Sequence, residues 1–427
     1  MLILANSPLN AADNVWVLMS TALVLMMCIP GLFLFYGGLV RGRNVLSVAA
    51  QCLTLTAMGV LMWWGFGYSL VFGKSFSEGG SLLRHLFGGT EHLGLVGVGA
   101  ESSPYEPRIF SGAFALFQAM FAAITPALII GAVAERMKFS AVLLFSALWT
   151  VGVYYPVAHA VWGATGAFAG LANAEAPFKA LDFAGGIVVH MTSGWSALLL
   201  CIMVGPRVGF GKWPMPPHSM VLCVLGTGML WTGWYGFNAG SALAMDGIAL
   251  QAFLTTTLSA SAALLSWAVV ERLHRGKISV LGLCSGAVAG LATITNAAGF
   301  VSGTAAVWIG VIAGVFSYAA CSWLKPRLGY DDALDTFGVH GVGGTMGALA
   351  TALCVNPLAN PAGAALSEKG LLQGQLIAMG LCIAFSLGVT WGVAKVVDLL
   401  VGLRASEEEQ AEGLDISDHN EEGYNHA

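Results

Sequence analysis

Apolar residues occur along most of the chain in long runs, and short polar segments separate these runs. A run of about 20 apolar residues is typical of a helix that crosses a membrane. Eleven runs occur, at approximately residues 15–40, 45–72, 109–133, 139–162, 183–204, 219–240, 248–270, 278–298, 303–324, 336–355 and 371–400. The pattern therefore predicts an all-α polytopic membrane protein with eleven transmembrane helices.

The charge distribution supports this prediction and orients the chain. Hydrophobic residues make up 57% of the 427 positions and charged residues 10%, against about 25% charged in a typical soluble protein. Successive segments between the runs lie on opposite sides of the membrane, and the segments on one side hold 13 of the 18 lysines and arginines. By the positive-inside rule that side is cytoplasmic. The N-terminus (1–14) is then extracellular and the C-terminal tail (401–427) cytoplasmic.

The two ends of the chain leave alternatives open. The N-terminal segment lacks the basic region and apolar core of a signal peptide, so either a leader has been removed or a short N-terminus crosses the membrane unaided. Eight of the 23 acidic residues lie in the last 21 positions. Such a tail is typically a solvated terminus without a specific role, and we expect the final residues, EEGYNHA, to be flexible.

The fifth and tenth runs share a pattern that indicates an internal repeat. Each opens with an aspartate and then carries a histidine: Asp182 and His190 in one, Asp335 and His340 in the other. If residues 15–205 and 219–355 are two five-helix units joined by a cytoplasmic linker (206–218), the odd number of helices inverts the second unit. The run 371–400 stands outside this repeat as an eleventh helix.

The two histidines are the main candidates for function. A polar side chain kept within a membrane usually marks a substrate or ion path. At about 1.5 Å per residue, His190 lies roughly 12 Å from one boundary and His340 roughly 7.5 Å from the other, so the rings could meet near the centre of the membrane. Small residues three, four and seven positions further on leave room for a lumen beside each ring. For His159 we expect instead a packed side chain with a structural hydrogen bond.

Aspartates and aromatic residues surround this candidate path. Asp182 and Asp335 are suited to capping their helices, and Asp182 also to shaping the field of an outer vestibule. Converging aromatic faces can hold a small cation, and a serine hydroxyl can accept a hydrogen bond from it. The candidates on the outer side are Phe117, Phe121, Trp162, Trp234, Phe237 and Ser241. Taken singly, each is equally typical of an interfacial aromatic belt.

Cysteine usage argues against redox or metal chemistry. Each of the eight cysteines falls in a different apolar run, without a close CxxC or Cys/His pairing. This spacing predicts buried free thiols rather than disulfides or a zinc site. We expect no metal, no cofactor and no nucleic-acid partner.

Three sequence blocks resemble the ammonium transporter family, the Amt/Rh superfamily, and in particular its bacterial Amt branch. They are DFAGGIVVHMTSGWSALLLCIMVGPR (182–207), GWYGFNAGSA (233–242) and DTFGVHGVGG (335–344). The resemblance extends from about residue 15 to the tail segment VGLRASEEEQAEGLD. Tyr235 stands where phenylalanine is frequent in the family, and the loop 73–108 has no clear counterpart.

The resemblance implies a homotrimeric ammonium transporter of the prokaryotic inner membrane, with one conduction path per subunit. Phe117, Trp162 and Ser241 would recruit ammonium, Phe121 and Phe237 would form a gate, and His190 and His340 would line the pore. Asp182, Trp234 and Asp335 would support them, and the tail would face a PII-type signalling protein. Neither an enzyme activity nor a cofactor is implied.

The residues leave the mechanism open between two routes. A desolvated ammonium ion is costly in an apolar lumen whereas ammonia is not, so the ion would lose its proton near the gate. The proton would then return outside, giving an electroneutral channel, or move along the histidines, giving an electrogenic transporter. Two rival classes are a membrane cytochrome that uses the histidines as haem ligands and a receptor that senses ammonium without meaningful flux.

Overall fold

The computed structural model describes residues 8–74, 76 and 82–424, and these residues form helices and loops without a β-strand. Residues 1–7 of the predicted extracellular N-terminus, parts of the loop 73–108 and residues 425–427 lie outside the described residues. The helices of the transmembrane part are α1 (Ala11–Met26), α2 (Leu32–Leu39), α3 (Val45–Met62), α4 (Tyr68–Phe72), α5 (Ser111–Val133), α6 (Phe139–Trp149), α7 (Tyr155–Trp162), α8 (Thr192–Val204), α9 (Met220–Gly240), α10 (Gly247–Arg275), α11 (Val280–Ile294), α12 (Gly303–Ala319), α13 (Lys325–Leu328), α14 (Val342–Cys354) and α16 (Leu371–Val401).

These fifteen helices, several of them joined in pairs by a π-helical turn, make up eleven spans that match the eleven predicted runs. Ten continuous helical segments of the described chain are long and apolar enough to cross a membrane. The remaining one, α11, has 15 residues, which span about 22 Å at about 1.5 Å per residue. The prediction of an all-α polytopic membrane fold is therefore confirmed.

Several spans contain π-helical turns. Such turns interrupt the ordinary hydrogen-bond ladder and often occur at functional sites. In the first span the interruption has a local cause, since Pro30 lacks the N–H that the ladder needs. The π-helical turns are found at Met27–Gly31, Trp63–Gly67, Thr150–Tyr154, Gly186–Met191, Ala320–Leu324 and Phe337–Gly341. Two of them, Gly186–Met191 and Phe337–Gly341, carry the histidines of the repeat.

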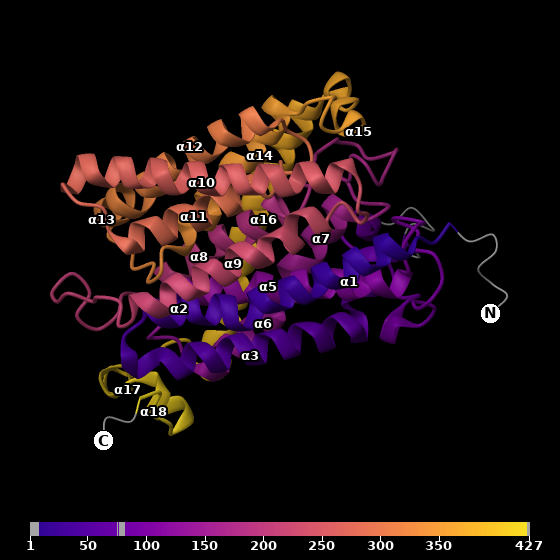
Figure 1. Cartoon of the computed structure of the whole chain (residues 1–427). Helices are drawn as coiled ribbons and strands as arrows, with labels where there is room; N and C mark the ends of the chain where they lie inside the picture. The colour runs from indigo at the N-terminus through magenta and orange to yellow at the C-terminus, as the bar shows by residue number, and fades with distance from the viewer. Residues whose placement is uncertain (1–7, 75, 77–81, 425–427) are drawn as a thin grey trace.

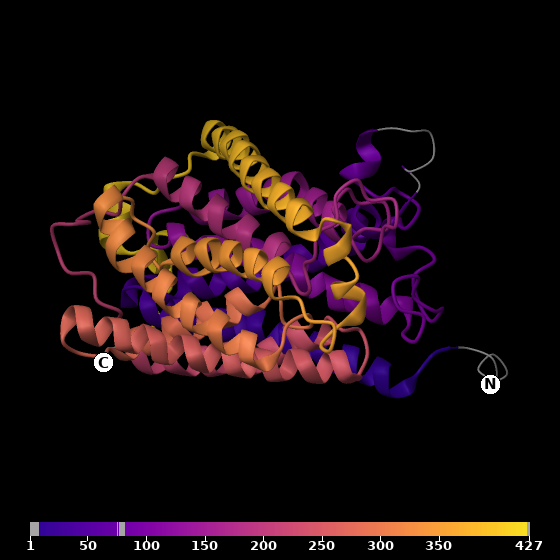
Figure 2. The same ribbon diagram turned by 90° about the horizontal axis from the view of Figure 1, so that it is seen from above.

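The spans lie side by side as one bundle with two distinct ends (Figure 1). One end, which we call the tail side, carries the C-terminal helices α17 (Glu407–Glu412) and α18 (Leu414–His419). The other, which we call the far side, carries the short helix α15 (Pro361–Ala364). The last span, α16, crosses the surface of the bundle obliquely instead of running along its neighbours (Figure 2), and it packs on α6 and α8.

The two histidine-bearing helices run in opposite directions. Arg207, just after the end of α8, forms an ion pair with Asp331, just before the π turn that leads into α14, with 2.8 Å between Nη2 and Oδ1. The end of α8 and the start of α14 therefore lie together on the tail side. This antiparallel arrangement is what an inverted repeat requires.

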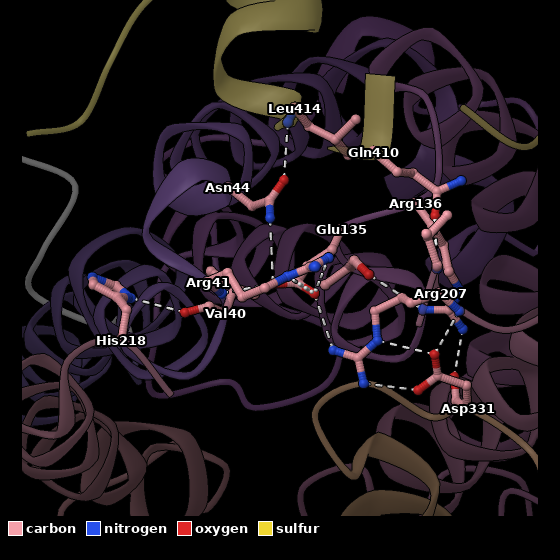
Figure 3. Close-up of polar contacts among 12 residues, drawn as sticks. Val40, Arg41, Asn44, Glu135, Arg136, Arg207, His218, Asp331, Gln410 and Leu414 are labelled. Carbon is pink, nitrogen blue, oxygen red and sulfur yellow. Dashed lines mark hydrogen bonds and ion pairs between the residues drawn. The ribbon is translucent and has the colours of Figure 1, made fainter. Parts of the chain in front are cut away.

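A buried ionic network closes the tail side (Figure 3). The Glu135 carboxylate is fully buried and pairs with the guanidinium groups of Arg41 and Arg207 at 2.9 and 3.1 Å. Arg207 is held by Asp331 through two side-chain hydrogen bonds of 2.9 and 2.8 Å. The buried guanidinium of Arg136 donates to backbone carbonyl groups, among them that of Gly205 at 2.7 Å. Four segments that are far apart in the sequence are thus fixed to one another.

The C-terminal tail packs onto this network, contrary to the expectation of a solvated terminus. Leu414 and Asp415 are 1% exposed. The Leu414 N–H donates to Asn44 Oδ1 at 2.9 Å, and the Ser47 N–H donates to Asp415 Oδ1 at 2.7 Å. Asp415 therefore caps the first turn of α3, while Asn44 receives the first N–H of α18. The acidic composition misled the prediction because the few residues that pack are interspersed among the charges.

Candidate functional site

His190 and His340 lie against each other inside the bundle. Their rings are nearly parallel, with centroids 5.1 Å apart and an interplanar angle of 13°, and the Nδ1 atoms are 3.1 Å apart. Both residues are buried, at 1% and 4% exposed. Because one Nδ1 must donate and the other accept, the pair shares a single proton along this line. A spacing of 3.1 Å leaves no room for a macrocycle between the rings, which argues against the cytochrome alternative.

The helix that carries His190 begins on a carboxylate. Both oxygens of Asp182 accept backbone N–H groups of the first turn: those of Gly185 at 2.6 Å, Gly186 at 2.8 Å, Ile187 at 2.8 Å and Val188 at 2.9 Å. A carboxylate at this end also complements the helix dipole. Burial raises the pKa of Asp182 to about 6, although the four N–H groups oppose this rise. Asp182 is thus a cap, and the residue also lines the cavity described below.

The corresponding cap of the tenth span is Asp332, so the expectation that Asp335 opens this helix was wrong. Asp332 accepts the N–H of Thr336 at 3.0 Å and that of Phe337 at 2.7 Å. Asp335 has a positive φ of 61° and instead forms an ion pair with Lys325. The chain carried a signal for this: Asp332 precedes His340 by eight positions, as Asp182 precedes His190.

Small residues beyond the histidines serve close packing of the two helices, in contrast to the lumen that we expected beside each ring. A Cβ on Gly194 would overlap the backbone of Gly341. A Cβ on Gly344 would lie 2.8 Å from the Gly186 carbonyl oxygen and 2.9 Å from His190 Cβ. Each glycine thus admits the backbone of the other helix, and together they set the separation of the imidazoles.

The histidine pair lines a very small cavity. Its volume is about 10 Å³ and its other walls are almost entirely apolar, including Ile124, Leu128, Trp234 and Phe237. A cavity of this size accommodates about one molecule as large as water. His190 Nε2 has no hydrogen-bond partner within the part of the chain that the structure describes, and such a buried nitrogen is available to a small polar guest.

A stacked pair of phenylalanines separates this cavity from a larger one on the far side. The rings of Phe121 and Phe237 lie 4.3 Å apart at 30°. Phe237 lines the histidine cavity, and Phe121 lines a far-side cavity of about 260 Å³. The walls of the far-side cavity also include Trp162, Ser241 and Asp182.

Two of the three predicted recruitment residues line the far-side cavity, and the third supports it. Trp162 meets Phe121 edge to face with centroids 5.9 Å apart, and its indole donates to the Asp182 carbonyl at 2.9 Å. The hydroxyl of Ser241 donates to the Phe237 carbonyl at 2.8 Å, which leaves its lone pairs as acceptors. Phe117 is fully buried and packs edge to face on Phe121 with centroids 5.0 Å apart.

Trp234 continues the line of stacked rings, and its orientation depends on a residue that the sequence analysis missed. Its ring lies 5.5 Å from that of His190 at 19°. The indole donates to Thr295 Oγ1 at 2.8 Å, while the Thr295 hydroxyl itself donates to the Leu291 carbonyl at 2.7 Å. No local pattern around Thr295 indicated this contact, because it joins residues 61 positions apart.

His159 and the cysteines have structural surroundings. His159 is buried on α7, and its ring nitrogens lie 2.7 Å from the Val71 carbonyl and 2.9 Å from the Arg84 carbonyl. All eight cysteines are free thiols. Among the described residues, no group of three or more histidine, cysteine, aspartate or glutamate side chains is placed to hold a metal ion.

Comparisons with known proteins agree with this architecture. Residues 15–424 match the Ammonium Transporter Family. The chain is 46% identical to a putative ammonium transporter of Methanothermobacter thermautotrophicus over 97% of this chain and 99% of that protein. It is 43% identical to an ammonium transporter of Bacillus subtilis, over the same two shares.

Solved structures show the same fold. The crystal structure of Candida albicans Mep2 superposes with a TM-score of 0.84 at 32% identity, covering 94% of this chain and 88% of that one. A structure described as a sensor Amt protein gives a TM-score of 0.83 at 27% identity, covering 96% and 98%. With matches along nearly its whole length, this multi-pass membrane protein belongs to the ammonium transporter family.

Proposed function

We propose that the chain takes up ammonium on the far side and passes ammonia through the histidine cavity to the tail side. The observation that carries this proposal is the pair of stacked imidazoles in an apolar cavity the size of one small molecule, closed by two stacked phenylalanines. A cavity without room for a hydration shell disfavours an ion by many kcal/mol, whereas a neutral molecule of similar size has no such penalty.

In this proposal the far-side cavity recruits the ammonium ion. The faces of Trp162 and Phe121 attract a cation through their ring quadrupoles, and Ser241 offers a hydroxyl acceptor. Asp182 adds a negative potential at the same cavity, and this effect does not require the carboxylate to touch the ion. Phe117 holds Phe121 in place, and Phe121 with Phe237 separates the hydrated ion from the dry cavity.

The histidine pair then handles the neutral molecule. A neutral imidazole has one donor and one acceptor nitrogen, and because the Nδ1 atoms bond to each other, His190 Nε2 is left for the guest. The proton either returns to the far side or moves along the shared Nδ1 line. The first route moves no net charge, and the second moves one charge per ammonia.

Proteoliposomes distinguish these routes. We expect an ammonium gradient to alkalinise or charge the lumen faster in vesicles with the chain than in empty vesicles, which ammonia enters only by diffusion through the lipid. We expect His340→Asn to abolish any current because the relay is broken. His92→Asn, a loop histidine bonded to the Val96 carbonyl, is the matched control. An unchanged current in His340→Asn contradicts the relay, and absent ammonium uptake by the unmodified chain contradicts the function.

We also propose the finer features of localisation and assembly. The lysine and arginine distribution supports a tail side that faces the cytoplasm, and the archaeal and bacterial relatives support a prokaryotic inner membrane. The family supports a homotrimer and a PII-type protein as the tail's partner. In this proposal the substrate only loses and regains a proton, and no cofactor takes part.

A sensing role is a second candidate. Its specific support is the ordered tail on the buried ionic network, together with the likeness to the sensor Amt protein. Ammonium uptake measured beside tail protection from proteolysis separates the candidates: a sensor changes tail protection on ammonium addition with negligible uptake.

A further inference from the structure

Two buried amide side chains hold the backbone on either side of Asp182. The Leu181 N–H donates to Gln375 Oε1 at 2.8 Å, and Gln375 Nε2 donates back to the Leu181 carbonyl at 2.9 Å. The same carbonyl accepts a hydrogen bond from Asn296 Nδ2 at 2.9 Å, while the Phe183 N–H donates to the Asn296 carbonyl at 3.1 Å. Both amide side chains are fully buried. The residues that flank Asp182 are therefore fixed from two directions.

One of these directions is α16, which takes no direct part in the transport path. Gln375 lies in the first turns of α16. The backbone of this helix also touches the same segment, since a Cβ on Gly374 would lie 2.2 Å from the Lys179 carbonyl oxygen. None of the described residues of α16 lines the far-side cavity or the histidine cavity. The helix therefore acts on the far-side cavity through the backbone before Asp182.

The backbone of Asp182 supports one wall of the far-side cavity. Its carbonyl accepts the indole N–H of Trp162 at 2.9 Å, and both residues line this cavity. The Asp182 carboxylate, by contrast, is bound to four N–H groups at the start of the His190 helix. A shift of the backbone at Leu181 would therefore move the acceptor of the Trp162 indole, while the carboxylate would stay with the helix that it caps.

Loss of the Gln375 amide would cause such a shift. A buried backbone N–H without a partner is unfavourable, and the Leu181 N–H has its acceptor in Gln375. Without this amide the segment would have to move until the N–H finds another acceptor. The carbonyl of Leu181 would keep only the bond from Asn296.

We propose that Gln375 is a positioning residue for ammonium recruitment, because its amide fixes the backbone that holds the Trp162 ring at the far-side cavity. This inference rests on the proposed function, in which the faces of Trp162 and Phe121 attract the cation. Such an attraction requires the cation to lie over the face of the ring, within about 6 Å of its centroid. A displaced ring therefore weakens binding of the ion and leaves the histidine cavity as it is.

The concentration dependence of ammonium uptake in proteoliposomes tests this inference. Gln375→Met keeps the length of the side chain and removes both hydrogen bonds. We expect KM to rise about fivefold, the change that corresponds to one cation–π contact at an exposed site, while Vmax changes by less than about twofold. A rise in KM at constant Vmax indicates lost binding of the substrate. Gln375→Leu is an independent variant should the first fold poorly.

Thr390→Val is the matched control on the same helix. Thr390 is also fully buried, and its hydroxyl bonds to Ser196 Oγ at 2.8 Å and to the Trp149 indole at 3.1 Å. It lies about 22 Å further along α16, at about 1.5 Å per residue. This variant should lose stability to a similar extent, measured by thermal unfolding, and leave KM unchanged.

A double-mutant cycle with Trp162→Phe tests the route of the effect. Phenylalanine lacks the indole N–H that bonds to the Asp182 carbonyl, so Gln375→Met should have little further effect on KM in this background. With a transporting unmodified chain, three results overturn the inference: unchanged KM in both Gln375 variants, an equal rise in Thr390→Val, or an undiminished rise in the Trp162→Phe background. Absence of uptake by the unmodified chain contradicts the proposed function instead, and the inference falls with it.

Discussion

Gly344 is the position where one added methyl group most directly tests the geometry of the histidine pair. An alanine there would place Cβ 2.8 Å from the Gly186 carbonyl oxygen, and 2.9 Å from both His190 Cβ and the Met191 nitrogen. All three atoms belong to a buried turn that offers no flexible side chain to move aside. Ordinary contacts of carbon begin near 3.5 Å, so α14 must retreat by about 0.7 Å.

This retreat would reach the imidazoles. The Nδ1 atoms are 3.1 Å apart, and a separation larger by about 0.7 Å exceeds the usual hydrogen-bond limit of about 3.2 Å. Overpacking of this kind costs about 1–3 kcal/mol. We therefore expect Gly344→Ala to unfold at lower temperature and to lose most ammonium-induced current or uptake in proteoliposomes.

Gly388→Ala is the matched control, since it places the same methyl group on a membrane-spanning helix where no other atom lies within 4 Å of the new Cβ. In a helix, alanine in place of glycine is favourable by about 0.5–1 kcal/mol, so this variant should be at least as stable as the unmodified chain and fully active. The reasoning is refuted if Gly344→Ala matches Gly388→Ala in both melting temperature and transport.

Three further predictions follow from the hydrogen bonds and ion pairs. Asp332→Ala should lower the free energy of unfolding by about 1–2 kcal/mol because it removes a helix cap. Asp335→Ala, which breaks a partly exposed ion pair, should lower it by no more than about 1 kcal/mol. Equal free energies of unfolding for the two variants would contradict the assignment of the cap. Thr295→Val should cost about 1–3 kcal/mol because it orphans the buried indole N–H of Trp234, measured by thermal unfolding and accompanied by reduced uptake. Glu135→Gln should lower the free energy of unfolding by about 3 kcal/mol at pH 7. Burial raises the pKa of Glu135, but the neighbouring guanidinium groups lower it by more, so its pKa in the folded protein lies below the usual 4.5. The loss of stability should therefore be complete above about pH 5 and shrink as the pH falls through the folded pKa, and a loss independent of pH would refute this account.

Much of the fold was predictable because the length of an apolar run decides whether it can cross a membrane as a helix. Each of the eleven runs became a helical span, and the antiparallel relation of the histidine helices agrees with the odd repeat. The shortest span, α11, was predicted as 278–298 and ends at Ile294, since the apolar residues after it continue as turns. Hydropathy does not distinguish a buried turn from the end of a helix.

The site was predictable to the extent that its residues are chemically unusual for their surroundings. His190 and His340 stand out as imidazoles in apolar segments, and the structure brings them together. The choice of Asp335 over Asp332 failed because proximity to the histidine was weighed above the eight-residue spacing. Thr295 and the docking of Asp415 were not predictable from local patterns, since each acts on a residue distant in the sequence.

The reciprocal capping by Asn44 and Asp415 has a consequence for how the protein is made. The chain emerges from the ribosome N-terminus first, so α3 enters the membrane long before the carboxylate that covers its first turn has been synthesised. That end of α3 is completed only by Asp415, which lies 368 positions after Ser47. A nascent or prematurely terminated chain therefore holds all eleven spans yet exposes an unfinished helix end, which distinguishes it from the mature protein.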